Sequence, residues 1–261
     1  MRLTRLYVER ELRPGSLIEL PAEAAEHIAR VLRARSGDAV ILFNGAGGEF
    51  DAVVDTVRAG RVTVAVGAGR GVERESPLAV TLIQCVPRGD RMDLIVQKTV
   101  ELGVARIVPV VSQRGVVRID RAQAESKAAH WRAIAVGACE QCGRNRLPRI
   151  DPVRPLVDHL GTAEIGGAAE VRWVLEPESA PPGRAAPADR TGTADRAGSP
   201  VPAAPREAHI AVGPEGGFTP EELEAFRLTG FTPAGLGPRV LRTETAAIAA
   251  VAWLQALFGD M

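Results

Sequence analysis

Apolar and polar residues alternate in several short runs within the first 70 residues of the chain. This period of two is typical of β-strands with one buried face, and it predicts strands over 3–9, 38–44, 49–57 and 61–66. Short glycine-containing turns separate the last three strands, which indicates a meander. Residues 21–34 instead have apolar positions at helical spacing, with a proline at the start. The pattern therefore predicts a small β-barrel with one helix.

From residue 78 onward, apolar strands alternate with amphipathic helices. Such alternation predicts a parallel sheet that is covered on both faces, as in an α/β domain. The stretch 67–77 is glycine-rich, charged and without periodicity, so we expect two domains, 1–72 and 73–261. The predicted strands of the second domain are 78–86, 106–111, 171–175, 209–212 and 231–236, and its predicted helices are 90–102, 122–142, 153–160, 220–228 and 243–258.

Residues 176–207 interrupt this α/β pattern. The segment contains seven prolines and eight alanines, and Val201 is its single larger aliphatic residue. A stretch of this composition buries too little apolar surface to order itself, so we predict a disordered surface loop. A hinge between two domains is the alternative, but the strand–helix–strand–helix unit that follows is too small to fold alone.

Composition adds a gradient of charge along the chain. The 32 basic and 32 acidic residues cancel overall, yet the net charge is zero over 1–75, +6 over 76–150 and −6 over 151–261. A local excess of this size is expected of a nucleic-acid footprint, although a solvated face would give the same count. The chain has three cysteines, no leader-like stretch and no apolar run of the roughly 18 residues that a membrane span needs. We therefore expect a cytoplasmic protein.

The strongest local signal is the stretch 211–222, with the sequence AVGPEGGFTPEE. An apolar strand ends here in a glycine-rich loop, and Thr219 and Pro220 have the chemistry of a helix cap and first turn. Glycines at the carboxyl end of a parallel strand let the backbone approach a ligand closely, and open α/β sheets bind ligands at this edge. The spacing fits neither a dinucleotide-binding loop nor a P-loop. We expect a ligand-binding loop, with a plain structural turn as the alternative.

A second strand–loop–helix junction follows, with the sequence LGPRVLRTETAA. Thr243 can cap the helix, and the acidic residue after it suits the positive end of the helix dipole. Two such loops at one edge of a sheet form adjacent walls of one crevice. Arg239 and Arg242 are placed to hold a phosphate or to stabilise negative charge, unless they only pair with Glu215 and Glu244.

The positively charged middle segment supplies further candidates. Arg88 precedes a predicted helix on which Lys98 and Glu101 are neighbours, either at a site or as a solvated pair. The next helix ends in the sequence CEQCGRNR, and its C-x-x-C spacing lacks the second pair or the spaced histidine that a zinc site needs. We expect packed thiols and no metal there, and a cluster of arginines at 144, 146 and 149 that suits a polyphosphate backbone.

Together these motifs resemble the bacterial methyltransferases that modify uridine N3 in small-subunit ribosomal RNA, a family of the SPOUT superfamily. The similarity covers nearly the whole chain apart from 176–207, with Arg88 where the family usually has lysine and Cys142 where it often has serine. The matching stretches are HI-x-x-VLR at 27–33, QK-x-x-ELG at 97–103, ACEQCGR at 138–144, GPEGGF at 213–218 and LGPRVLRTETA at 236–246.

The resemblance implies a fold and an activity. It implies an N-terminal PUA-like barrel that binds RNA and a C-terminal SPOUT α/β domain whose last segment forms a trefoil knot. It also implies a homodimer that uses S-adenosyl-L-methionine to methylate one specific uridine of 16S ribosomal RNA, either as free RNA or in the small ribosomal subunit. The long insert after Leu175 departs from the family pattern at the rim of the implied pocket.

The resemblance also suggests roles for individual residues. We expect Arg242 to face the negative charge that develops on a uracil carbonyl, and Glu101 or Glu140 to accept the N3 proton. The expected cofactor-binding residues are Leu175, Gly213, Pro214, Glu215, Gly216, Gly217, Leu236, Gly237, Arg239, Leu241, Thr243 and Ala246. The expected RNA-binding residues are Arg30, Arg33, Arg88, Lys98, Gln141, Arg144 and Arg146.

Two other functions remain open at this point. One is methylation of a different RNA position, and the other is non-catalytic RNA binding by a protein that kept the fold. Reverse-transcription stops on ribosomal RNA would distinguish methylation of uridine N3 from methylation of another position, because a methyl group on N3 blocks base pairing. If calorimetry detected no binding of the cofactor, the non-catalytic function would be favoured.

Overall fold

The computed structural model describes residues 3–31, 33–58, 60–115, 117, 119–162, 171–180 and 205–261. Most of the predicted disordered loop, residues 181–204, lies outside this part of the chain. The fold divides into two compact units, one formed by residues 1–75 and 133–148 and the other by 76–132 and 149–261. Each unit is described by itself below.

The first unit contains a five-stranded sheet in the order β1-β3-β4-β5-β2. The predicted meander is present, because β3 (Ala39–Phe43), β4 (Glu49–Arg58) and β5 (Arg61–Arg70) pair antiparallel in sequence order. Strand β1 (Thr4–Tyr7) adds to β3 in parallel. The sequence did not predict β2 (Leu17–Glu19), which has three residues and buries only one of them.

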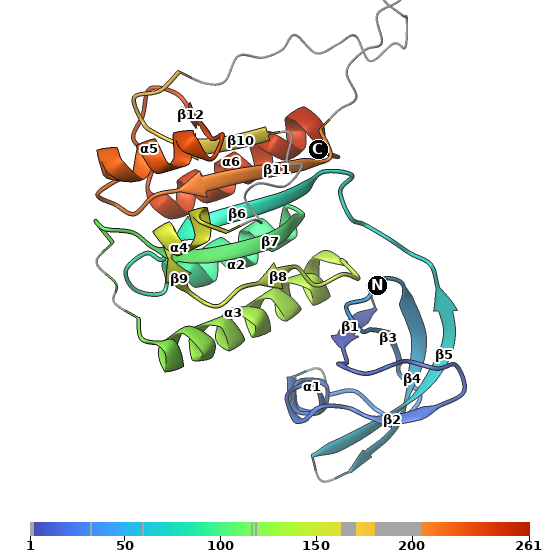
Figure 1. Ribbon diagram of the computed structural model, residues 1–261. Coiled ribbons are helices and arrows are strands. Elements are labelled where there is room, and N and C mark those ends of the chain that lie inside the picture. Colours follow the sequence, from blue (N-terminus) through green and yellow to red (C-terminus); the bar gives the residue numbers. More distant parts are fainter. Residues whose placement is uncertain are drawn as a thin grey trace, which may run out of the picture. The chain divides into compact units, whose positions relative to one another are not determined.

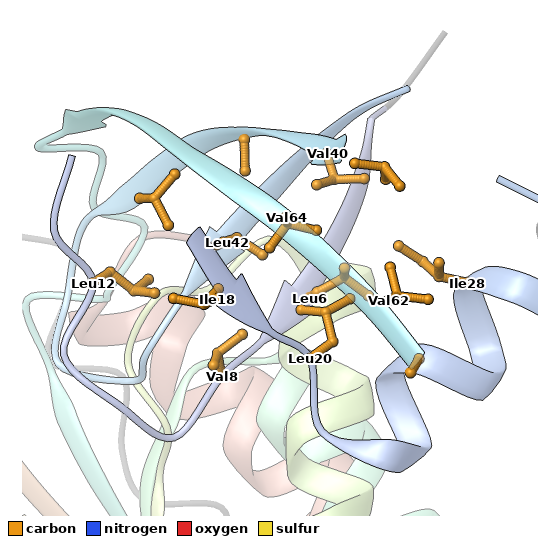
Figure 2. Close-up of a cluster of buried hydrophobic side chains, with 14 residues drawn as sticks. Leu6, Val8, Leu12, Ile18, Leu20, Ile28, Val40, Leu42, Val62 and Val64 are labelled. Carbon is orange, nitrogen blue, oxygen red and sulfur yellow. The ribbon is translucent and has the colours of Figure 1, made fainter. Parts of the chain in front are cut away.

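The core of this unit is a cluster of aliphatic side chains enclosed by the sheet and its helix. Figure 2 shows Leu6, Ile18, Leu42, Val62 and Val64 pointing toward one another from strands β1, β2, β3 and β5, and all are less than 7% exposed. These are the inward positions of the alternating pattern, so the period of two found along the sequence is the physical cause of this core.

The predicted single helix over 21–34 is wrong in its length and regularity. The α-helix α1 spans Ala22–Glu26, and a π-helical turn continues it over His27–Val31. The Ala34 N–H then bonds to the Ile28 carbonyl at 3.1 Å, and Arg33 adopts a left-handed φ of 52°. This bond and conformation are typical of a helix end, so the helical segment stops before residue 33.

A short stretch after the long helix joins the first unit through buried polar contacts. The guanidinium of Arg5 bonds to the Glu49 carboxylate, to the Asn145 side chain and to the Arg144 carbonyl. Arg5, Glu49, Arg144 and Asn145 are all less than 9% exposed. Because buried charges are stable only when paired, this network fixes residues 144 and 145 against β1 and β4.

The second unit contains the expected parallel sheet, in the order β12-β10-β11-β6-β7-β8, with β9 beside β7 (Figure 1). Every pair of neighbouring strands in it is parallel. The strands are β6 (Ala79–Cys85), β7 (Val104–Val111), β8 (Arg149–Ile150), β9 (Arg154–Pro155), β10 (Val171–Leu175), β11 (Glu207–Val212) and β12 (Thr232–Ala234). The two-residue strands β8 and β9 carry no periodic signal, and the sequence did not predict them.

Helices cover both faces of this sheet. On one face, α4 (Leu156–Leu160) and α5 (Pro220–Leu228) pack on a core of alternate strand residues together with three phenylalanines. On the other, α2 (Arg91–Glu101) and α6 (Thr243–Phe258) contact each other and strands β6, β7 and β11. The long helix α3 spans Arg121–Cys142. Within the described residues, no helix combines the length and apolarity that crossing a membrane requires.

Helix α4 begins later than the predicted residue 153. Arg154 and Pro155 pair with the end of β7, and Pro155 is the N-cap of the helix. A residue that precedes the first helical turn keeps an extended backbone, so these two residues extend the sheet instead of the helix.

Candidate active site

A cavity of about 290 Å³ lies at the carboxyl ends of β10, β11 and β12. Three segments line it, and two of them are the loops that the sequence singled out. The lining residues are Leu175, Glu176, Pro177, Val212, Gly213, Pro214, Glu215, Gly217, Ala234, Leu236, Gly237, Arg239, Val240, Leu241, Arg242, Thr243 and Ala246. The prediction that both loops form walls of one crevice is therefore confirmed.

Hydrogen bonds at the start of helix α5 fix the end of the first loop. As predicted, Thr219 caps α5: its hydroxyl accepts from the Glu222 N–H at 3.3 Å, and the Glu222 carboxylate accepts from the Thr219 N–H at 2.9 Å. The other oxygen of Glu222 accepts from the Gln113 N–H at 2.7 Å, which fixes this helix start against the end of β7. Gly217 has a φ of +69° and open space where a side chain would begin. The loop therefore presents backbone to the cavity.

Thr243 has a different role from the predicted one. The N-cap of α6 is Arg242, and no side chain caps this helix. The Thr243 hydroxyl instead donates to the Gly213 carbonyl at 2.9 Å and accepts from the Gln84 amide at 3.0 Å. One buried hydroxyl thereby joins the second loop to the first loop and to β6.

Gln84 is a site residue that the sequence analysis missed. It is completely buried, and its amide also donates to the Cys85 carbonyl at 2.8 Å. Buried polar side chains need partners, so a glutamine inside a largely apolar strand indicates a structural hydrogen bond. The amide side chain at this position within 78–86 was the available signal.

The cavity rim carries two arginines without acidic partners. The predicted alternative, in which Arg239 and Arg242 pair with Glu215 and Glu244, is wrong. Arg91 of α2 lies near both glutamates, with nitrogen–oxygen distances of 2.7 Å to Glu215 and 4.0 Å to Glu244. Among the residues that the structure describes, neither Arg239 nor Arg242 forms an ion pair, and both are exposed. The rim therefore has positive charge available for a ligand or for developing negative charge.

Comparison with known proteins identifies the family. Residues 74–255 match the model of an RNA methyltransferase domain, and residues 20–66 match that of an RNA methyltransferase PUA domain. The chain belongs to this RNA methyltransferase family. The first unit is accordingly PUA-like, and the second is the α/β methyltransferase domain.

Relatives and solved structures agree with this assignment over at least 94% of each chain. The chain is 31% identical to ribosomal RNA small subunit methyltransferase E of Buchnera aphidicola, with 100% of this chain and 98% of the relative covered. The Bacillus subtilis protein of the same name is 29% identical, with 95% and 94% covered. A putative methyltransferase of Legionella pneumophila, solved with S-adenosylmethionine, has a TM-score of 0.86 and 38% identity, with both chains fully covered. Ribosomal RNA small subunit methyltransferase E of Neisseria gonorrhoeae, also solved with that cofactor, has a TM-score of 0.81 and 34% identity, again with full coverage.

Most of the expected cofactor-binding residues of this methyltransferase chain line the cavity. Gly216 is the exception: its carbonyl accepts from Arg114 at 3.2 Å, and Arg114 also donates to the Phe218 carbonyl at 3.2 Å. Val240 lines the cavity, was not predicted, and is 81% exposed.

The structure does not bring the two expected proton acceptors into the cavity lining. Glu101 lies on α2 and forms hydrogen bonds of 3.0 and 3.1 Å with Lys98, as the alternative of a solvated pair predicted. Glu140 belongs to the first unit, where its carboxylate accepts from the Tyr7 N–H at 2.9 Å. Each carboxylate thus has a structural partner.

The expected RNA-binding residues differ in accessibility. Arg33, Arg88 and Gln141 are exposed, and Lys98 is half-buried. The exposed Arg30 pairs with Glu26 at 2.6 Å, and the exposed Arg146 pairs with Glu73 at 3.2 Å. Arg144 is only 4% exposed, and its guanidinium bonds to Glu75, with one nitrogen–oxygen distance of 3.0 Å. Arg144 is therefore too buried to make the predicted direct contact with an RNA phosphate, and it instead acts as a structural residue of the first unit.

The two thiols at the end of α3 pack as expected. Cys139 is completely buried, and the side-chain contact with Cys142 together with burial raises its pKa. A thiol in this environment is a weak nucleophile and a weak metal ligand. Within the described part of the chain, no group of three or more histidine, cysteine or acidic side chains could hold a metal ion.

Proposed function

We propose that this chain transfers a methyl group from S-adenosyl-L-methionine to N3 of one specific uridine in 16S ribosomal RNA. The observation that carries the proposal is that the two loops, 213–218 and 236–246, line one cavity and are joined through Thr243. Arg242 borders this cavity and forms no ion pair with the residues that the structure describes. The names of the relatives and the cofactor bound in the structural neighbours support the substrate and the methyl donor.

The cavity residues fit this cofactor. Leu175, Leu236 and Leu241 would supply apolar walls for the adenine ring, and the loop backbone would supply polar groups for the ribose and the amino acid end. Gly237 has a φ of +102° with open space beyond its Cα, so a side chain there would project into free volume. When bound, the cofactor supplies an electrophilic methyl group on a positively charged sulfur.

The protein's own contribution is to position the acceptor and to stabilise charge. Loss of the N3 proton leaves negative charge on the uracil carbonyl oxygens, and a guanidinium can donate hydrogen bonds to such an oxygen. Arg242 is suited to this role because it lines the cavity and has no competing carboxylate among the described residues. Holding donor and acceptor in line supplies much of the remaining rate acceleration.

Glu101 and Glu140 stay our candidates for the proton acceptor, and mutagenesis tests each of them. Each must first release its present partner, Lys98 or Tyr7, before it can accept a proton from the base. If substitution of one of them by glutamine leaves the methyl-transfer rate unchanged, that residue is not the acceptor, and if neither substitution changes the rate, solvent takes the proton.

We further propose how the chain is organised around this reaction. The barrel of 1–72 binds RNA through Arg30, Arg33 and neighbouring surface, and 73–261 performs the transfer, with Arg88, Lys98, Gln141 and Arg146 contacting RNA. The last segment of the chain forms a trefoil knot, and two copies form a homodimer in the cytoplasm. The matches to PUA and methyltransferase models support this division, and light scattering of the purified protein tests the dimer.

One assay tests the activity directly. Small ribosomal subunits from a strain that lacks this gene are incubated with the protein and methyl-labelled cofactor. We expect label in 16S RNA and a new reverse-transcription stop at a single uridine. Label at another nucleotide would reassign the target, and cofactor binding without any label in subunits or free RNA would overturn the proposed reaction.

A further inference from the structure

Arg91 is a charged residue near the cavity to which the proposed reaction gives no role. It is the first residue of α2, and the loop before it follows the carboxyl end of β6. Strand β6 pairs with β11 in parallel, so the start of α2 lies at the same edge of the sheet as the loop after β11. The topology of the sheet therefore places Arg91 beside the cavity loops.

Packing fixes the backbone from which the Arg91 side chain extends. The next buried residues of the helix, Met92, Ile95 and Val96, are at most 1% exposed. Helix α2 also packs against α6, which begins within the second cavity loop. The core of the unit thus sets the position of the Arg91 backbone, while 42% of the side chain stays exposed.

The guanidinium of Arg91 lies close to one carboxylate from each cavity loop. Its Nη1 atom donates a hydrogen bond of 2.7 Å to Glu215, and its Nε atom lies 4.0 Å from a carboxylate oxygen of Glu244. Different nitrogens of one rigid group therefore face the two loops. The Glu244 side chain is only 13% exposed, and opposite charges attract more strongly where water is largely excluded. Both contacts draw the loops toward α2.

Glu215 lies at the tip of the first loop. The Gly217 N–H bonds to the Pro214 carbonyl at 2.9 Å, so Glu215 is a central residue of a β-turn. The Thr243 hydroxyl joins the base of the same loop directly to the second loop. Arg91 adds a contact at the turn itself, where the Glu215 residue lines the cavity. The two loops are thereby connected at two separate points.

We propose that Arg91 is a positioning residue that sets the spacing of the two cavity loops and thereby strengthens cofactor binding. A loop that is already ordered loses less conformational entropy when a ligand binds, so the affinity for that ligand increases. The inference rests on the proposed function only for the identity of the ligand, S-adenosyl-L-methionine. It assigns Arg91, a residue of the positively charged middle segment, to the cofactor site instead of the RNA-binding surface.

Calorimetry of cofactor binding tests this role without any methyl transfer. We expect Arg91→Gln to weaken the binding of S-adenosyl-L-methionine by about three- to five-fold, because an ion pair between partly exposed side chains has a modest strength. Arg91→Lys should lose less affinity than Arg91→Gln, since it keeps a positive charge near Glu215. A wild-type affinity in Arg91→Gln would overturn the proposal.

A double-mutant cycle tests whether Arg91 acts through Glu215. Each single substitution removes the same contact, so Arg91→Gln combined with Glu215→Gln should weaken cofactor binding no more than Glu215→Gln does alone. If the losses of the two single variants instead multiply in the double variant, Arg91 affects the cofactor independently of Glu215 and the proposal is wrong.

A matched control removes an ion pair elsewhere in the same unit. Arg227 on α5 bonds to Glu224 at 2.7 Å, and the side chains of both residues are more than half exposed. Arg227→Gln should keep the wild-type affinity for the cofactor. A loss equal to that of Arg91→Gln would reflect the removal of any surface charge and would contradict a specific role of Arg91.

Kinetics separate this role from a direct contact with RNA. Arg91→Gln should raise KM for the cofactor and leave KM for small ribosomal subunits unchanged. A higher KM for subunits together with a wild-type cofactor affinity would show that Arg91 contacts RNA, which is the opposite assignment. Failure of the proposed function is distinguishable, because the cofactor would then bind with the expected dependence on Arg91 while no methyl group reached RNA.

Discussion

At the scale of single residues, the proposed reaction depends most on Arg242 at the cavity rim. Arg242 lines the cavity, is exposed and has no carboxylate partner among the described residues. We predict that Arg242→Ala lowers kcat by about 100- to 1,000-fold, because a donor to the developing charge is lost. Cofactor affinity, measured by calorimetry, should change by less than about three-fold, since the loop backbone and apolar walls remain.

Arg239→Ala is the matched control for this prediction. It removes the same charge from the same loop, but we expect it to affect kcat much less than Arg242→Ala does. Equal losses of cofactor affinity and turnover in Arg242→Ala would show that Arg242 holds the cofactor and does not act on the base.

Thr243 links three parts of the site through one buried hydroxyl. Its Oγ1 atom donates to Gly213 and accepts from Gln84, and the residue is 5% exposed. We predict that Thr243→Val lowers the free energy of unfolding by about 1–3 kcal/mol and weakens cofactor binding, because two buried polar groups lose a partner. Thr245→Val, at an exposed position of the same helix, should change neither quantity in urea unfolding and calorimetry. Similar losses in both variants would mean that only helix propensity was measured.

At the scale of secondary structure, agreement with the sequence depends on the length of the periodic signal. Helix α6 has the predicted bounds, and α5 begins at the predicted proline, because each combines strong apolar spacing with clear end signals. Strands β2, β8 and β9 have two or three residues, which is too short for a period to be visible. The helix over 21–34 changes to a π-helical turn and then ends, for reasons of local hydrogen bonding that spacing does not reveal.

Roles that depend on long-range partners were not predictable from the sequence. Arg144 looks like a surface cation in a basic cluster, yet Glu75, 69 positions away in the chain, accepts its hydrogen bonds. Arg91 belongs to no motif of the sequence, yet it lies against glutamates of both cavity loops. The two loops themselves were predictable, since strand–loop–helix junctions in a parallel sheet gather at one edge.

His209 lies near arginines of two other strands, and this arrangement makes the stability of the protein depend on pH. The pKa of His209 on β11 falls to about 4 through burial and the arginines of β10 and β7. An unfolded histidine has a pKa of about 6.5, so between these values the unfolded chain binds a proton that the folded chain does not. Stability is therefore full above about pH 6.5 and falls as pH decreases toward 4, by up to roughly 3 kcal/mol.

We predict that His209→Gln flattens this pH dependence. Urea unfolding at pH 7.5 and at pH 5 should give a smaller difference in the variant than in the wild type. His130→Gln is the control, because the side chain of His130 is 59% exposed and its Nε2 atom lies 2.9 Å from the Asp93 carboxylate. An unchanged difference in His209→Gln would show that other groups cause the acid sensitivity.

At the scale of the whole molecule, the long insert meets the site at its beginning. Glu176 and Pro177 line the cavity, the Glu176 N–H bonds to the Ala234 carbonyl at 3.0 Å, and the Gly235 N–H bonds to the Ala180 carbonyl at 3.1 Å. Residues 176–180 therefore support the second cavity loop. The rest of the insert, 181–204, is rich in proline and alanine and contains no aromatic residue.

Two deletions of the insert should consequently differ in effect. Replacing 181–204 by a short Gly–Ser linker should leave kcat and cofactor affinity within about three-fold of the wild type, because entropy changes only slowly with the length of a flexible loop. Replacing 176–204 by the same linker should weaken cofactor binding at least ten-fold, since it removes two lining residues and the bond to Gly235. Both variants are compared by calorimetry and by methyl transfer to small subunits. If the variant without 181–204 folds and binds cofactor but transfers no methyl group, the insert has a part in RNA recognition.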